Sequence, residues 1–199
     1  EAFVHTCAIG MLDNSEINIL ALDTDLDNGN FSRLKTLIED GYMKVKGYNR
    51  THYPLQETFF SAKINLFTFT PDYSNSVKSG SFEALTKYAY ANDSKKDLAN
   101  ILLTPQVREF DLKHGYRAQT HLGSLLMYHS IIEEVTKNPH GKLAEFIQKI
   151  YDAGELGDAR VFVCGSVFGG TGASSIPILP KAFNAAINIL EPGKTLTKA

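Results

Sequence analysis

A glycine-rich segment in the last fifth of the chain has the composition of a loop that holds phosphate. It reads Gly165-Ser-Val-Phe-Gly-Gly-Thr-Gly-Ala-Ser174 and lies between an apolar run at 159–164 and a helical pattern at 178–190. Glycine allows unusual backbone angles and close approach, so that backbone N–H groups can wrap an anion. Thr171 and Ser174 add hydroxyl donors. The segment therefore predicts phosphate binding without a lysine, although a tight strand-to-helix turn would give a similar pattern.

Acidic and hydroxyl side chains follow an apolar run near the start of the chain. Residues 17–22 are almost continuously apolar, as in a strand buried on both faces, and Asp23, Thr24 and Asp25 follow them directly. Such runs alternate with helical patterns, which predicts an α/β fold with a Rossmann-like, mainly parallel sheet flanked by helices. Ligands bind such sheets beyond the carboxyl ends of the strands. We therefore expect these three residues and the glycine-rich segment to face one crevice.

Both segments resemble parts of one family of nucleotide-binding proteins. Residues 161–177 look like the strand, phosphate loop and helix start of the tubulin/FtsZ superfamily. Ile19-Leu-Ala-Leu-Asp-Thr-Asp25 is similar to its strand ending in Asn-Thr-Asp. The resemblance implies that the ligand is GTP or GDP with Mg²⁺, and that Asp23, Thr24 and Asp25 lie near the nucleotide and the metal. The loop residues that it assigns to nucleotide binding are Gly165, Ser166, Gly169, Gly170, Thr171, Gly172 and Ser174.

The resemblance also implies a mode of assembly. It predicts subunits that associate head to tail into filaments, with GTP hydrolysis completed by an acidic loop of the adjacent subunit. The protein would then be a GTPase in its full-length, assembled form, and no catalytic residue is assigned within this chain. Phe168 and Ser174 stand where the family has glycine, which indicates a divergent prokaryotic branch. Arg117 lies roughly where the family senses the terminal phosphate, and it either donates to a phosphate oxygen or is an exposed surface arginine.

Other functions remain open for the glycine-rich loop. The altered Phe168 and Ser174 would also suit a non-polymerising nucleotide-binding module with a regulatory or scaffold role. Val167-Phe-Gly-Gly-Thr-Gly172 resembles the first-turn fingerprint of NAD(P)-dependent oxidoreductases, although the last glycine of that fingerprint would fall at Ser175. A Walker A loop is excluded because no lysine follows Gly172.

Composition indicates which classes of partner and which cellular compartment to expect. The chain of 199 residues is 43% hydrophobic and has a net charge of −2 with no basic stripe, so we expect no nucleic-acid partner. No apolar run approaches the roughly 18 residues of a membrane span. Cys7 and Cys164 lie far apart and the histidines are scattered, which predicts neither a disulfide framework nor a metal site. A reducing cytoplasm fits this pattern.

We interpret residues 1–199 as part of one nucleotide-binding domain, clipped at both ends, with an insertion at about 72–120. Gly41 is expected to end the second helix, and the helices at 121–137 and 142–152 to cover one face of the sheet. The patterns predict helices at 3–12, 31–38, 121–137, 142–152 and 178–190, with weaker ones at 81–91 and 95–103. Strands are predicted at 17–22 and 159–164, with one or two more in 59–70.

Overall fold

The chain forms a mixed α/β structure that is mostly helical, with one two-stranded parallel sheet. The computed structural model describes residues 1–12, 16–25, 29–52, 58–71, 73, 101, 104–108, 112, 116–157 and 159–196. The chain divides into two compact units. We call Glu1–Leu22 with Leu26–Phe69 the sheet unit, and Asp23–Asp25 with Thr70–Ala199 the loop unit. Within the described ranges, no helix is long and apolar enough to cross a membrane.

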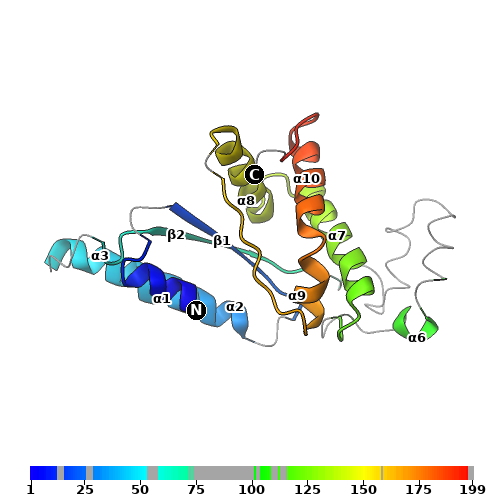
Figure 1. Cartoon of the computed structure of the whole chain (residues 1–199), viewed down its shortest axis with the longest axis horizontal. Coiled ribbons are helices and arrows are strands. Elements are labelled where there is room, and N and C mark those ends of the chain that lie inside the picture. Colours follow the sequence, from blue (N-terminus) through cyan, green and yellow to red (C-terminus); the bar gives the residue numbers. More distant parts are fainter. Residues whose placement is uncertain are drawn as a thin grey trace. The chain divides into compact units, whose positions relative to one another are not determined.

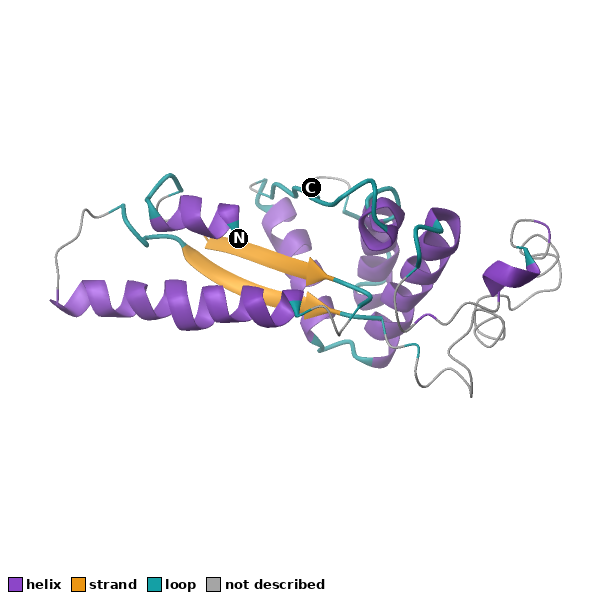
Figure 2. Cartoon of the chain, turned by 90° about the horizontal axis from the view of Figure 1, so that it is seen from below, coloured by secondary structure: helices purple, strands orange, loops and turns teal. Residues whose placement is uncertain are grey.

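The sheet of the sheet unit consists of β1 (Glu16–Leu22) and β2 (Lys63–Phe69), which confirms both predicted strand regions. The strands are parallel, in register from Glu16↔Lys63 to Leu22↔Phe69, and Figure 2 shows their arrowheads at the same end. Side chains alternate between the two faces of a strand. Paired residues of parallel strands share a face, so Ile17 and Ile19 lie on the same face as Ile64 and Leu66.

The first helix, α1 (Ala2–Ala8), is shorter than the helix predicted at 3–12. Gly10 follows it with a φ of 78°, and its N–H donates to Cys7 O at 3.2 Å. Met11 N–H donates to Thr6 O at 3.1 Å, which completes the hydrogen-bond pattern of a Schellman helix end. The prediction missed this stop, so Met11 and Leu12 lie beyond the helix and are exposed.

The second helical region continues past Gly41, where the sequence predicted its end. It consists of α2 (Asn30–Lys35), the π-helical segment η1 (Thr36–Tyr42) and α3 (Met43–His52). Two side chains one turn apart fix the continuation, because Tyr42 Oη donates to Ala62 O at 2.9 Å and Lys46 Nζ donates to the same oxygen at 2.7 Å. These bonds tie η1 and α3 to the start of β2, and they outweigh the weak helix propensity of glycine.

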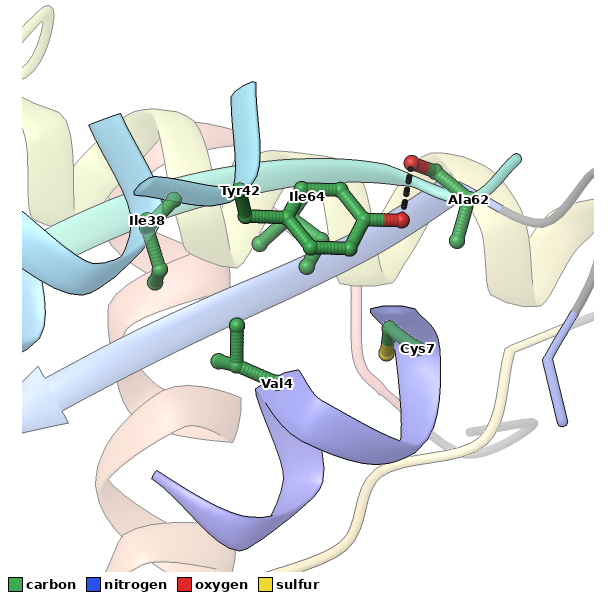
Figure 3. Packing of buried hydrophobic residues seen from close by; sticks show 6 residues of the cluster. All are labelled: Val4, Cys7, Ile38, Tyr42, Ala62 and Ile64. Atoms are coloured by element: carbon green, nitrogen blue, oxygen red, sulfur yellow. Dashed lines mark hydrogen bonds between the residues drawn. The ribbon is translucent and has the colours of Figure 1, made fainter. Parts of the chain in front are cut away.

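An apolar cluster joins these elements in the core of the sheet unit (Figure 3). Val4 and Cys7 of α1 face Ile38 and Tyr42 of η1, and Ile64 of β2 belongs to the same cluster. Ile17, Ile19 and Leu66 are packed against the cluster from the same face of the sheet. Burial of apolar area therefore holds α1 and η1 on one side of the strands.

The loop unit is built from helices in the part that the structure describes. Its longer helices are α7 (Thr120–Lys137), α8 (Lys142–Glu155) and α10 (Leu179–Leu190), which confirms the three predicted there. The shorter ones are α6 (Pro105–Arg108) and α9 (Gly170–Ser175). Helix α7 lies against α9 and α10, and α10 also contacts α8 (Figure 1). Within this unit α7 and α8 pack on other helices, and their expected role as a cover for a sheet stays a prediction.

The strand predicted at 159–164 is also wrong. This segment is extended but has no strand partner among the described residues, so its apolar side chains stay exposed and Phe162 is 84% accessible. The helix after the glycine-rich loop is broken into α9 and α10, because Pro177 and Pro180 lack the N–H that a continuous helix needs. Most of the proposed insertion at 72–120, with the helical patterns at 81–91 and 95–103, lies outside the described residues.

Candidate functional site

The two sequence motifs that predicted a phosphate site meet in the loop unit. Thr24 Oγ1 and Thr171 Oγ1 lie 2.6 Å apart and share a hydrogen bond, although 147 positions separate them in the chain. Thr24 is only 5% exposed, so this bond is largely shielded from water. The expected proximity of Asp23, Thr24 and Asp25 to the glycine-rich loop is thus observed at its central residue.

The acidic motif is organised by its own first side chain. Asp23 Oδ1 accepts the Thr24 N–H at 2.8 Å and the Asp25 N–H at 3.2 Å. An aspartate that bonds the backbone one and two residues ahead shapes a local turn. These two bonds fix the backbone from Asp23 to Asp25, so that Thr24 lies in a defined turn between two aspartates.

Close backbone approach is what requires glycine in the loop. A Cβ on Gly172 would lie 2.5 Å from Ser166 O, and a Cβ on Gly165 would lie 3.3 Å from the Cα of Gly172. The loop therefore folds back onto the first turn of α9 at a point where no side chain fits. The expectation of unusual dihedral angles is not met, because no loop glycine is among the residues with positive φ. A Cβ on Gly169 would have no other atom within 4 Å, so this residue borders open space.

The first turn of α9 presents its backbone donors without a capping side chain. The first four N–H groups at a helix start have no partner within the helix, and here they belong to residues 169–172, counted from the N-cap Gly169. Ser174 and Ser175 are buried, and their hydroxyls donate back to Gly170 O at 2.5 Å and Thr171 O at 2.7 Å. The Ser174 hydroxyl thus stabilises the first turn of α9. Its predicted contact with phosphate stays a prediction. Ser166 Oγ accepts the Phe168 N–H at 3.2 Å.

Arg117 lies beside the loop, in a turn with unfavourable backbone angles. Gln119 N–H donates to Tyr116 O at 2.8 Å, and the intervening Arg117 and Ala118 have φ values of 46° and 60°. This is the pattern of a type I′ turn, which favours glycine or asparagine at both central positions. A left-handed residue with a side chain costs about 1–2 kcal/mol. A Cβ on Gly170 would lie 3.2 Å from Ala118 N, so this strained turn packs directly against the start of α9.

Two buried tyrosines lie under this turn. Tyr116 Oη and Tyr73 Oη share a hydrogen bond of 2.5 Å, and Ser130 Oγ donates to Tyr73 Oη at 3.4 Å. Burial raises the pKa of Tyr73 to about 12, and burial together with the Tyr73 hydroxyl raises the pKa of Tyr116 well above its ordinary value. Both phenols are therefore protonated at neutral pH, and the pair is held as a neutral hydrogen bond.

The sequence did not single out Tyr73, Tyr116 or Gly123. Nothing in the spacing of the tyrosines links them, since they are 43 positions apart. Gly123 did carry a signal, because a glycine inside a helical pattern often marks close packing. A Cβ at this position would overlap the Ser174 hydroxyl and the Tyr116 ring, so Gly123 lets α7, Tyr116 and α9 meet.

Across the described residues, no group of three or more His, Cys, Asp or Glu side chains could hold a metal ion. Comparison of the chain with protein-family models, curated proteins and solved structures gives no match.

Proposed function

We propose that this chain is the nucleotide-binding part of a tubulin/FtsZ-like protein and that its glycine-rich loop holds the phosphates of GTP or GDP. The observation that carries the proposal is the 2.6 Å hydrogen bond between Thr24 and Thr171, which joins the two family-like motifs. The acidic motif directly follows β1 in the chain, and ligands of α/β folds bind beyond the carboxyl ends of such parallel strands. Proximity of two motifs from opposite ends of the sequence supports a shared ligand more strongly than either motif alone.

The phosphates would be bound mainly by neutral donors of the loop. Backbone N–H groups of Gly170, Thr171 and Gly172 begin an uncapped helix, and Gly169 leaves open space beside them. The Thr171 hydroxyl adds a donor, and Gly165 and Ser166 shape the loop behind it. Arg117, exposed in the adjoining turn, supplies a guanidinium for a terminal phosphate.

Mg²⁺ is compatible with these residues although they form no protein cage for it. Magnesium commonly takes one or two carboxylates, several waters and the phosphates of its nucleotide. Asp23 and Asp25 provide carboxylates of this kind next to Thr24. The ion would neutralise charge on the phosphates, while the protein groups position them.

Assembly is the second part of the proposal. Val167 and Phe168 are 68% and 93% exposed on the loop itself, and large apolar side chains in such a position suit an interface. We propose that subunits stack head to tail and that an acidic loop of the neighbour completes hydrolysis. A non-polymerising nucleotide-binding module is the second candidate, favoured by the Ser174 hydroxyl, which bonds Gly170 O instead of facing outward.

Thermal protection by Mg·GTP, Mg·ATP and NADPH tests the ligand. At about a hundred times its dissociation constant, a ligand adds roughly 2.7 kcal/mol, which raises Tm by several degrees. We expect protection by Mg·GTP in the wild-type chain and its loss in Gly169→Glu, which places a carboxylate in the open space at the loop. Gly47→Glu is the matched control, because its Cβ direction is equally open but lies on α3.

The outcomes separate the candidates. Protection by Mg·GTP that survives Gly169→Glu would place the ligand elsewhere, and protection by NADPH alone would favour an NAD(P)-dependent oxidoreductase. No protection by any of the three would contradict nucleotide binding. GTP-dependent sedimentation of the full-length protein would support assembly, whereas GTP binding by a protein that stays monomeric would favour the regulatory module.

A further inference from the structure

The strained turn at Arg117 and Ala118 needs something to hold it. Two successive residues with positive φ and a side chain are unfavourable, and such geometry persists only where the surroundings impose it. The turn closes through Gln119 N–H to Tyr116 O, so its position depends on where Tyr116 lies. What fixes Tyr116 therefore fixes the turn.

The Tyr116 ring is wedged between α7 and the start of α9. It fills the notch that Gly123 leaves in α7, where a Cβ would overlap the ring and the Ser174 side chain. Its own Cβ lies close to Gly170, 3.3 Å from where a Cβ would stand on that residue. Ser124 Oγ also donates to Ser174 O at 2.8 Å, which joins α7 to α9 on the other side of this contact.

The far end of the ring is fixed by its hydroxyl. Tyr116 is 1% exposed, and its Oη bonds Tyr73 Oη, which in turn accepts from Ser130 Oγ on α7. If the Tyr73 hydroxyl is removed, the Tyr116 hydroxyl stays buried without that partner, which is unfavourable enough to move the ring.

We propose that Tyr116 is a positioning residue: seated at Gly123 and tied to Tyr73, it presses the left-handed turn against Gly170 and so orders the glycine-rich loop. The effect on the loop is a property of the folded chain without ligand. The consequence for nucleotide affinity rests on the proposed function, because a preordered loop loses less freedom on binding.

Amide hydrogen exchange of the ligand-free chain tests the positioning itself. We expect exchange across residues 166–176 to be about tenfold faster in Tyr73→Phe than in wild type, while α8 and α10 change little. The double variant Tyr73→Phe/Tyr116→Phe removes both hydroxyls and keeps both rings, so it should recover most of the protection. Ser130 can then donate within its own helix.

Phe146→Leu is the control for general destabilisation. Phe146 of α8 packs edge to face on Phe183 of α10, with ring centroids 6.1 Å apart, in a contact that includes neither the turn nor the loop. Variants are compared at equal loss of unfolding free energy. Unchanged loop exchange in Tyr73→Phe, equal loosening of the loop in Phe146→Leu, or no recovery in the double variant would each overturn the proposal.

Titration of the same variants with Mg·GTP separates this inference from the proposed function. We expect Tyr73→Phe to bind about tenfold more weakly than wild type, with the double variant and Phe146→Leu close to wild type. If the wild-type chain binds no GTP, the proposed function fails, while the exchange experiment still decides whether Tyr116 positions the loop. Faster loop exchange with unchanged GTP affinity would overturn the link between the turn and the ligand.

Discussion

Each of the two units buries a tyrosine that ties separate elements together, but the two tyrosines bond different kinds of partner. In the sheet unit, Tyr42 Oη donates to the main-chain oxygen of Ala62, which also accepts from Lys46 Nζ. In the loop unit, Tyr116 Oη bonds another buried hydroxyl, that of Tyr73. An acceptor with two donors keeps a partner when one is lost, whereas the Tyr116 hydroxyl loses its Tyr73 partner when that hydroxyl is removed.

The backbone next to Tyr116 is strained, whereas the backbone next to Tyr42 is not. Tyr42 lies within a continuous run of helical residues, and its neighbour Met43 has a φ of −70°. Tyr116 precedes two residues with positive φ, and strain of this kind gathers at functional sites. The carbonyl that holds Tyr42 therefore has a second donor, whereas the strained turn after Tyr116 is held through the buried bond between Tyr116 and Tyr73.

The strongest test of this contrast is a pair of glycine substitutions inside helices. Gly123→Ala should destabilise the loop unit by about 3 kcal/mol, because its Cβ meets Ser174 and the rigid Tyr116 ring. Gly47→Ala adds a Cβ in open space on α3 and should stabilise the sheet unit by up to about 1 kcal/mol. Urea unfolding followed by circular dichroism measures both changes. A neutral Gly123→Ala would show that Tyr116 is loosely seated.

Alkaline pH gives the next largest effect. Burial raises the pKa of Tyr73 in the folded chain from 10.0 to about 12. This contribution to stability is fully present below about pH 10, and it is lost as pH rises towards 12, because the unfolded chain releases the proton first. We expect Tyr73 alone to contribute a loss of about 2 kcal/mol over this range, and Tyr116, whose pKa burial also raises, to add to it.

Urea unfolding at fixed pH values from 9 to 11.5 measures the alkaline loss. Tyr73→Phe/Tyr116→Phe is the matched variant and should show a flatter dependence on pH. The remaining slope includes Tyr42, whose pKa is also raised by burial. An identical slope in the double variant would mean that the hydroxyl pair does not govern the alkaline response.

The smallest effect is expected at Tyr42 itself. Tyr42→Phe should cost less than about 1 kcal/mol, because Lys46 still donates to Ala62 O and the ring stays in the core. Amide exchange in β2 should be nearly unchanged, unlike the loop of Tyr73→Phe. A loss above 2 kcal/mol, or faster exchange throughout β2, would remove the distinction between the two tyrosines.

Local patterns predicted elements far better than they predicted how those elements pack. The ranges of α7, α8 and α10 are predictable because their helical apolar periodicity is long and regular, and residues 17–22 because they form an almost continuous apolar run. The helix does not end at Gly41 as predicted. The hydrogen bonds from Tyr42 and Lys46 to Ala62 O stabilise its continuation, and the local sequence gives no sign of these contacts. The strand predicted at 159–164 failed because an apolar run becomes a strand only when another strand supplies hydrogen bonds.

Local sequence patterns are enough to predict the long periodic helices and the apolar strand at 17–22, and to mark the glycine-rich loop and Asp23-Thr24-Asp25 as chemically distinctive. Tertiary structure decided that Thr24 bonds Thr171, that Gly172 and Gly123 are needed for close approach, and that Tyr116 packs with Tyr73 under a strained turn. Helix periodicity and turn chemistry depend on neighbours a few residues apart. The Tyr73–Tyr116 and Thr24–Thr171 bonds instead join residues 43 and 147 positions apart, which only the folded chain brings together.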